Sequence, residues 1–502
     1  MCASLIRGIV PYRGLDRHRD DRDERYDDCG GGEMRDDREA PPADVKVVLI
    51  AEDEAIVAQA EGTCSTRLDG NTGRGEILEV GRVTQSSSIE RAEGNIPPVA
   101  GDVTESTSTY RYVIEASILL LQFAMGLSFL AVAPLFPPIV AAFHVDNATV
   151  SLLVGVSSLT LAIALVPASV LAARLGSKWS LVLGGVLMGA TGLSMLATSF
   201  PLLLATRVSF ALGAAINLSA TPAVILRWFS TRELAVVNGA NVIAQSLGVA
   251  LSMLLAPRLA GPLGWDGALT VFGVAALGAT ALWLILGRDT GAPSIEAAFT
   301  MRDLSTVLRN RTVALLSIGV AGALGGFISL QTWLPTFYSQ QWGYSLEEAG
   351  AISGLLSFCG ILGALLGSAL PVRLPRRRPF LIAGGLGIPL FATGAIAMNL
   401  PVVLYPSVVL LGVAGWIFMP IVFTIPMEVP GMNASRVGIA VAVVLGSANL
   451  AGFFAPLMVG AVRDLTGSFT PGLAIACALS LVLVGCAVAM PETGTLAPRS
   501  PP

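Results

Sequence analysis

Long apolar segments dominate the pattern of hydrophobic and polar positions from residue 111 onward. Each run is roughly 18–26 residues long, enough to cross a hydrocarbon core about 30 Å thick. The approximate bounds of these runs are 112–136, 150–173, 180–198, 201–226, 237–259, 266–287, 313–337, 349–371, 379–398, 402–426, 436–460 and 471–490. The pattern predicts an all-α polytopic membrane protein with twelve transmembrane helices.

Residues 1–110 follow a different pattern, in which charged and polar residues are interspersed without a spanning run. They contain 13 Lys/Arg and 23 Asp/Glu, whereas residues 111–490 contain 17 and 11. Low hydrophobicity combined with many charges predicts a disordered acidic tail. Because no apolar core follows the first basic residues, we do not expect a secretory signal peptide. Whether the tail is functional or reflects a start site assigned too far upstream stays open.

One fragment of the tail, VKVVLIAEDEAIVA (45–58), resembles the first strand and acidic loop of a response-regulator receiver. The residues that remain before the first span are too few to complete that fold. We therefore do not expect a functional receiver.

Composition narrows the classes of function. Hydrophobic residues make up 53% of the chain, charged residues 13%, and the mean hydropathy is +0.71. The six cysteines form no CxxC pair, and there are only two histidines. The cysteines favour neither a disulfide framework nor a zinc site, and two histidines argue against a histidine-based metal or catalytic cluster. We expect no enzyme activity, no cofactor, no metal and no nucleic-acid partner.

The distribution of basic residues between alternate loops predicts the orientation in the membrane. One set of loops carries thirteen basic residues and the other only Arg258 and Arg463. The thirteen are Arg174, Lys178, Arg227, Arg232, Arg288, Arg302, Arg309, Arg311, Arg373, Arg376, Arg377, Arg378 and Arg436. Because cytoplasmic loops are enriched in Lys and Arg, we expect both termini to be cytoplasmic in a multi-pass plasma-membrane protein.

The longest connection within the membrane part divides the twelve spans into two groups of six. The predicted organisation is a tail (1–110), a first six-helix half (111–287), a cytoplasmic inter-half loop (288–312), a second six-helix half (313–490) and a C-terminal tail (491–502).

The two halves show internal repetition. Gly239 and Pro257 in the fifth span recur as Gly438 and Pro456 in the eleventh, each offset by 199 residues. Since six spans is an even number, the two repeats enter the membrane in the same orientation. They should therefore be related by a pseudo-symmetry axis along the membrane normal, with a central site between them.

Helix starts are marked at corresponding places in the halves. Asp146 precedes the second span and Ser345 the eighth. Ser345 is followed three residues later by Glu348, the pattern of a capping box.

These features together resemble the major facilitator superfamily over essentially all of 111–490. Between its second and third spans that family has a loop of the form G-x-x-x-D-R-x-G-R-R/K, which appears here as SVLAARLGSK, matching at Arg174, Gly176 and Lys178. The family's glycine and aspartate fall on Ser169 and Ala173, so the charge relay assigned to that aspartate is in doubt. The second-half loop GSALPVRLPRRR is basic and also lacks the aspartate.

Further stretches refine the resemblance. Arg207 followed by Gly213 matches the arginine and glycines of the family's fourth span, whereas GANVIAQSLGVALSMLLAP does not clearly show the glycine-rich pattern of antiporters. The stretches at 333–350 and 426–456 look like the cyanate- and nitrate-type anion permeases and their uncharacterised relatives.

The resemblance implies a monomeric secondary active permease that moves a small solute by alternating access. The expected solute is a small organic or inorganic anion. The alternatives are a uniporter or exporter of a neutral or apolar molecule, or a non-transporting receptor that uses the acidic tail. The coupling proton or ion, the direction of transport and the substrate stay open.

Arg207 is the only full charge that lies well inside any of the predicted spans. It shares a helical face with Phe210, Ala214, Asn217 and Thr221, so it is expected to look toward a cavity or a partner. An anionic substrate would neutralise it. The alternative is that Arg207 locks its helix to the carbonyls of a neighbour.

In the family, the first, fourth, seventh and tenth spans line the cavity, which suggests further substrate-binding side chains. The predicted substrate-binding residues are Arg207, Asn217, Thr221, Gln122, Gln331, Trp416 and Thr424. Gln245, Ser317 and Asn449 are further polar candidates. Amide side chains in membrane helices also hold helices together, which is the alternative role for each.

The basic loops are expected to form the cytoplasmic gate. The predicted gating residues are Arg174, Gly176, Lys178, Arg373 and Arg376, acting on helix C-termini or on Glu233 and Glu428. The alternative is that these charges only set the topology. Glycines at 155, 176, 239, 248, 438, 446 and 452 are expected to permit sliding contacts between helices.

Overall fold

The computed structural model describes residues 46–51, 54–59, 109–230, 233–288, 301–374, 376–432 and 434–494. They belong to two units, 1–97 and 98–502. In the first unit, β1 (Lys46–Ala51) and β2 (Glu54–Gln59) pair as an antiparallel hairpin. Each strand contains Val and Ile, β-branched residues that suit a pleated surface.

The hairpin is the described part of the predicted N-terminal tail, and it is formed by the receiver-like fragment. The second half of that fragment pairs back on the first as a strand. The rest of the predicted tail, up to residue 108, lies outside the described residues.

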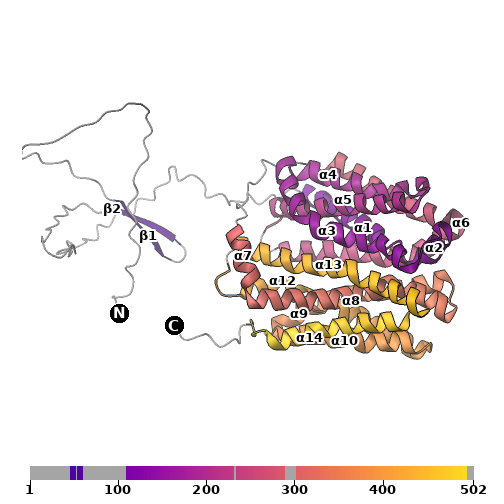
Figure 1. Cartoon of the computed structure of the whole chain (residues 1–502). Helices are drawn as coiled ribbons and strands as arrows, with labels where there is room; N and C mark the ends of the chain where they lie inside the picture. Colours follow the sequence, from indigo (N-terminus) through magenta and orange to yellow (C-terminus); the bar gives the residue numbers. More distant parts are fainter. Residues whose placement is uncertain are drawn as a thin grey trace, which may run out of the picture. The chain divides into compact units, whose positions relative to one another are not determined.

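The second unit is a helical bundle (Figure 1). Its elements are α1 (Tyr110–Phe129), η1 (Ala133–Leu135), α2 (Phe136–Phe143), α3 (Asn147–Leu175), α4 (Ser177–Met188), η2 (Gly189–Leu196), α5 (Phe200–Trp228), α6 (Leu234–Leu286), α7 (Met301–Arg309), α8 (Arg311–Trp342), α9 (Leu346–Arg373), α10 (Arg378–Ala397), α11 (Pro401–Trp416), α12 (Met419–Glu428), α13 (Ala434–Thr466) and α14 (Thr470–Ala489).

Twelve crossings follow from these helices, as predicted. Eleven stretches of the described chain are long and apolar enough to span a membrane, and one of them, Val236–Leu286, has 51 residues. That stretch of α6 is broken at Gly264, whose φ of 75° is not helical. Positive φ is a conformation that glycine adopts without strain. The chain therefore turns at Gly264 without a separate loop, and α6 holds the fifth and sixth spans.

The two six-helix halves repeat the same packing. In the first half α1 packs on α6 and α3 on α5, and in the second half α8 packs on α13 and α9 on α11. Two seams join the halves, α3 against α13 and α6 against α9. The pairing of equivalent helices confirms the predicted pseudo-symmetry. The helix α7, within the inter-half loop, contacts the second half through an Asp303–Arg436 ion pair of 2.8 Å.

Small residues set how closely the seams pack. Gly155 of α3 contacts Phe453 of α13, where an added Cβ would lie 3.1 Å from the ring. Gly452 lies against Ser158 in the same seam. Gly248 approaches the backbone of Phe123 between α1 and α6. Close helix approach through glycine is the usual way to pack helices in lipid.

The two ends of the bundle differ in how the halves meet. At the end that contains Asn147, Gly350 and Asp464, here called the closed end, the halves touch: a Cβ on Gly350 would lie 2.5 Å from the Met253 carbonyl. At the end that contains Arg174 and Arg377, here called the basic end, no described atom lies within 4 Å of a Cβ built on Gly239 or Gly438. The halves therefore touch at the closed end, whereas Gly239 and Gly438 are exposed at the basic end.

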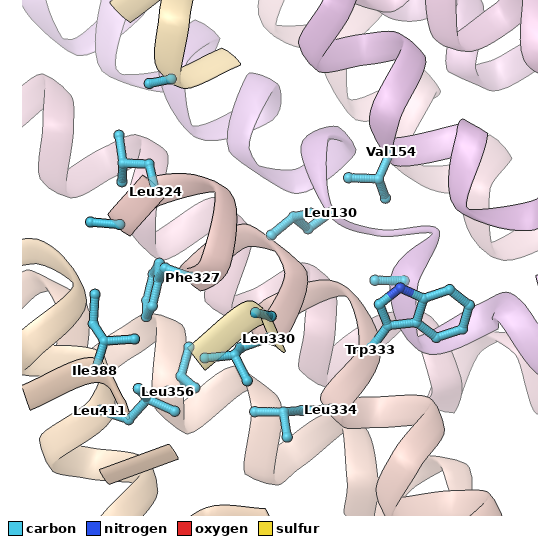
Figure 2. Close-up of a cluster of buried hydrophobic side chains, with 14 of the residues drawn as sticks. Leu130, Val154, Leu324, Phe327, Leu330, Trp333, Leu334, Leu356, Ile388 and Leu411 are labelled. Atoms are coloured by element: carbon cyan, nitrogen blue, oxygen red, sulfur yellow. The ribbon is translucent and has the colours of Figure 1, made fainter. Parts of the chain in front are cut away.

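Helix caps and a shared apolar core hold the closed end. Asp146 accepts a hydrogen bond from the Thr149 backbone N–H at 2.7 Å, and Ser345 forms the predicted capping box with Glu348. Figure 2 shows Leu130 and Val154 of the first half in one cluster with side chains of α8. In that cluster the Trp333 indole donates to the Pro456 carbonyl at 2.8 Å.

Candidate functional site

A small cavity of ≈ 70 Å³ lies between the two halves. The lining side chains come from α1, α6, α8, α9 and α11, with Leu130 directly after α1. They are Phe129, Leu130, Gln245, Ser246, Val249, Gln331, Ser357 and Trp416. A water needs about 10–15 Å³ by this kind of measure, so the cavity has room for several water-sized groups. Its size suits a small solute.

The polar lining consists of amides and hydroxyls contributed by both halves. The Gln331 side chain of α8 donates to the Ser357 hydroxyl of α9 at 3.1 Å, which fixes the amide across two helices. Gln245 and Ser246 come from α6 in the other half. The structure thus brings together Gln331 and Trp416, both predicted, with Gln245. Ser246 and Ser357 were not predicted.

Arg207 does not line this cavity in the present conformation. It is fully buried on α5, and its guanidinium donates to the carbonyls of Leu153 at 3.1 Å, Ser128 at 2.9 Å and Phe129 at 2.8 Å. Because α1 ends at Phe129, the last carbonyls of that helix lack intrahelical N–H partners. They also carry the negative end of the helix dipole. Arg207 therefore locks α5 to α1 and α3, as in the alternative role considered for it.

The positive charge of Arg207 nevertheless lies directly behind the cavity wall. Phe129, whose carbonyl accepts from Arg207, is itself a lining residue. In the described part of the chain no carboxylate forms an ion pair with Arg207. The guanidinium also stacks over the Phe210 ring, 4.8 Å from its centroid. Its charge is therefore shared with carbonyl dipoles and a π face, and it is not neutralised.

Three predicted residues form a network inside the first half. Gln122 donates to the Thr221 hydroxyl at 3.4 Å, and Thr221 donates to the Asn217 amide oxygen at 3.0 Å. Asn217 lies 3.9 Å from the Met188 sulfur. This network joins α1, α5 and α4 and does not reach the cavity lining. Thr424, predicted in the second half, donates to its own helix at Pro420.

The other polar candidates are also outside the lining. The hydroxyl of Ser317 is buried with no hydrogen-bond partner in the described part of the chain, and Asn449 donates to the Leu445 carbonyl of its own helix. Each therefore serves helix packing in this conformation.

The predicted gating residues lie at the basic end. Gly176 has a φ of 77° and forms the turn between α3 and α4, which explains the glycine at that point of the loop. Arg174 is exposed and Lys178 half-buried. The side chain of Arg373 lies outside the described residues, and Arg376 is exposed beside Arg378 and Glu492.

The ion pair of the second basic loop is formed by a neighbouring arginine. Arg377 pairs with Glu428 at 2.6 Å, and its backbone N–H donates to Glu492 at 2.7 Å. Glu428 belongs to the second half, and Glu492 lies in the C-terminal tail directly after it. This pair therefore fixes the loop to its own half and does not bridge the halves.

Metal chemistry has no candidate cluster in the ranges that the structure describes. His, Cys, Asp and Glu side chains form no group of three or more there that could hold a metal ion.

Comparisons with known proteins place this architecture in a family. The sequence model described as Major Facilitator Superfamily matches residues 118–456. An uncharacterised protein of Campylobacter jejuni, Cj0987c, is 29% identical over 199 residues, covering 39% of this chain and 62% of its own length. A probable nitrate/nitrite transporter of Mycobacterium tuberculosis, NarK2, is 28% identical over 246 residues, covering 47% of this chain and 60% of its own length. The chain thus spans about three fifths of these relatives.

A solved structure shows the same fold. The crystal structure of a bacterial homologue of the human lysosomal transporter Spinster, inward-facing and unoccupied, superposes with a TM-score of 0.62 at 19% identity. It covers 76% of this chain and 95% of that one. The family match covers most of both six-helix halves, ending within α13, and includes the lining residues and Arg207. The chain belongs to the Major Facilitator Superfamily, whose members are multi-pass membrane transporters.

Proposed function

We propose that this protein is a secondary active transporter that moves a small anion by alternating access. The cavity between the halves is the substrate site, because residues of both halves must meet there for a rocking motion to expose it to either side in turn. The contacts at the closed end, together with the exposed Gly239 and Gly438 at the basic end, support an access state that is open at the basic end.

The observation that carries the anion assignment is the uncompensated Arg207 behind the cavity wall. In a low-dielectric interior, a buried charge acts on its neighbours much more strongly than it would in water. Its field favours an anion at the adjacent cavity and disfavours a cation. A lone buried guanidinium is costly, and a transported anion would offset part of that cost during each cycle.

The cavity lining supplies donors for such an anion. Gln245 and Gln331 line the cavity from opposite halves with side-chain amides, and Ser246 and Ser357 add hydroxyls. Neutral donors bind an anion without forming a fixed ion pair, so release stays easy. The similarity to a probable nitrate/nitrite transporter supports an anion of this size.

The residues predicted for the cavity and the gate have distinct roles in this proposal. Gln331 and Trp416 contact the solute in the state seen here, whereas Gln122, Asn217, Thr221 and Thr424 act when the halves have moved. Arg174, Gly176, Lys178, Arg373 and Arg376 form the gate at the basic end.

The proposal also includes the orientation of the protein in the membrane and its division into two halves. The excess of Lys and Arg at the basic end makes that end cytoplasmic, with both termini inside and the protein in the plasma membrane. The state described here is then inward-facing. The protein acts as a monomer of two halves, 111–287 and 313–490.

A neutral polar solute is the second candidate, because the eight lining residues include no charged side chain. Amides and hydroxyls bind a neutral polyol as readily as an anion. The two candidates differ in their dependence on Arg207, since only an anion gains from the charge behind the wall.

The test is flux into proteoliposomes that contain the purified full-length protein. The panel contains nitrate, nitrite, cyanate, small mono- and dicarboxylates and a neutral polyol. Saturable uptake of an anion by the wild type, lost in Arg207→Gln and retained in part by Arg207→Lys, supports the proposal. Thermal unfolding of each variant shows whether it is folded. Uptake of the polyol alone, unchanged in folded Arg207→Gln, contradicts the anion assignment.

A further inference from the structure

A second buried polar pair lies outside the cavity, in the interface between α1 and α6. Glu115 of α1 is 8% exposed, and Asn241 of α6 is 6% exposed. The Asn241 side-chain amide donates to Glu115 Oε1 at 2.7 Å and to the Val237 carbonyl at 2.9 Å. No substrate or gating role has been given to either residue above.

The other two oxygen atoms of this pair have no donor. Glu115 Oε2 and Asn241 Oδ1 are both buried with no hydrogen-bond partner in the described part of the chain. An ionised carboxylate only accepts hydrogen bonds, whereas a protonated one carries an O–H donor. A buried charged oxygen without a partner is strongly unfavourable. A proton on Glu115 removes the charge and supplies the one donor that this pair of oxygens lacks.

The charged groups at this end of the first half are engaged elsewhere or lie apart from Glu115. Arg111, one turn before Glu115, pairs with Glu233 at 3.3 Å. Arg288 stacks over the Tyr110 ring, 3.9 Å from its centroid. At this end of the bundle, Arg227 on α5 and Lys178 on α4 are the remaining charged groups in the described part of the helices packed against α1. Within the described residues, none of these forms an ion pair with Glu115.

The pair is connected to the cavity along one face of α6. Asn241 and Gln245 are four residues apart, so they share a helical face and are separated by about 6 Å along the axis. Gln245 lines the cavity, and its backbone carbonyl meets Gly126 of α1 at the helix crossing. Any tilt of α6 relative to α1 must therefore change both the cavity and the Glu115–Asn241 contact.

We propose that Glu115, positioned by Asn241, is a proton-binding site coupled to solute binding in the cavity. The proton forms the O–H bond at Oε2, neutralises the carboxylate, and leaves to water when the transport cycle exposes Glu115. This inference rests on the proposed transport function and adds its coupling ion.

Flux measurements on the full-length protein test the coupling. Wild type, Glu115→Gln, Glu115→Asp and Ser117→Ala are compared for exchange of a panel anion at equal pH on both sides, over an acid-to-alkaline series. Ser117 is a matched control because it is also buried on α1 and donates to its own helix at Val113. Accumulation is then measured under an imposed gradient of one pH unit, in both directions.

The proposal expects exchange by the wild type and by Ser117→Ala to change with pH. Exchange by Glu115→Gln, whatever its rate, should not change with pH. One coupled proton supports about tenfold accumulation per pH unit. Glu115→Gln should show none, and Glu115→Asp should restore the pH dependence. The proposal is overturned if wild-type flux does not change with pH. It is also overturned if Glu115→Gln still accumulates the anion under the pH gradient.

Infrared titration separates this proposal from the transport function. The carbonyl stretch of a protonated carboxyl group should titrate in the wild type and be missing in Glu115→Gln. If no panel member is exchanged by the wild type, the proposed function fails for those solutes. The infrared signal still decides whether Glu115 holds a proton, since an identical signal in both proteins refutes the site.

Discussion

The Asp464 carboxylate of α13 accepts a hydrogen bond from the Asn147 side-chain amide of α3 at 2.6 Å. It also accepts from the backbone N–H groups of Asn147 at 3.2 Å and Ala148 at 2.8 Å. A carboxylate at a helix N-terminus satisfies donors that have no partner within the helix and complements the helix dipole. Because α3 and α13 belong to different halves, this contact holds the closed end shut.

Replacing Asp464 with Asn should therefore weaken the closed end. The loss of charge-assisted hydrogen bonds at an exposed site should cost about 1 kcal/mol, which changes the ratio of closed to open molecules about fivefold. Distances between spin labels on the first turn of α3 and the last turn of α13 measure the populations.

Glu347→Gln is the matched control for Asp464→Asn. Glu347 also joins the halves at the closed end, but its contact with Arg258 is a 3.9 Å exposed ion pair. Exposed pairs of this kind contribute little. A distance distribution in Asp464→Asn that equals that of Glu347→Gln would contradict the role given to Asp464.

A negative charge in the cavity should oppose an anionic substrate. In Gln331→Glu the new carboxylate stands where the amide now faces the cavity. Two like charges about 4 Å apart repel by about 4 kcal/mol at an effective dielectric constant of about 20. The half-saturating anion concentration should rise at least about tenfold, as measured by uptake into proteoliposomes.

The neighbouring Thr332→Val variant serves as its control. The Thr332 hydroxyl donates to its own helix at the Ile328 carbonyl, and its side chain is fully buried. Saturation by the anion should stay close to that of the wild type. Equal affinity in wild type and Gln331→Glu would remove Gln331 from the substrate site.

A bulky side chain at Gly438 should stop the cycle without preventing folding. No described atom lies within 4 Å of a Cβ at this position, so an indole fits the conformation seen here. Closure of the basic end would bring the halves onto that indole. We expect Gly438→Trp to unfold at the wild-type temperature and to show no flux above protein-free vesicles.

Gly485→Trp tests whether the effect depends on position. Gly485 of α14 is also exposed, with no described atom within 4 Å of its Cβ position. This variant should transport normally. Full flux in Gly438→Trp would mean that the basic end does not close during transport.

Because Asp146 caps the N-terminus of α3, the stability of the protein should fall at acid pH. The hydrogen bonds from Thr149 hold the pKa of Asp146 below its ordinary value. A depressed pKa stabilises the fold above the pKa of the unfolded chain, and that stability is lost as pH falls through the folded-state pKa. Asp146→Ala should lower stability by about 0.5 kcal/mol near neutral pH, a value reduced for solvent exposure.

Thermal unfolding in detergent micelles at neutral and acid pH measures this difference. Asp146→Asn keeps an N-cap acceptor and does not titrate, so its stability should show a smaller acid dependence than that of the wild type. A deficit in Asp146→Ala that is the same at both pH values would show that the charge of Asp146 contributes nothing.

The fold was largely predictable because span length and loop charge are local properties. Apolar runs reveal the crossings, and Asp146 and Ser345 reveal helix starts. The fifth and sixth spans were also predictable as separate helices, since the non-helical φ at Gly264 divides α6 between them.

The site was less predictable because it depends on where helices end. Arg207 lies on the helix face expected for a substrate ligand. Its hydrogen-bond partners are instead backbone carbonyls, two of which lack intrahelical N–H partners because α1 ends at Phe129. Ser246 and Ser357 were not predicted, because serine is common in membrane helices and neither residue belongs to a spacing pattern that indicates a binding site. The hydrogen bond from Gln331 was the feature that distinguished Ser357.

The helix α6 carries Asn241 and Gln245 on one face and also forms a seam with α9 of the other half. If the proposals hold, the proton site, the cavity and the contact between the halves all involve the same part of α6, the helix that precedes Gly264. Thermodynamic linkage then demands reciprocity: the factor by which the solute strengthens proton binding equals the factor by which the proton strengthens solute binding. Acidity would thus act as an allosteric effector of the carrier, and a titration from either side would report the same coupling free energy.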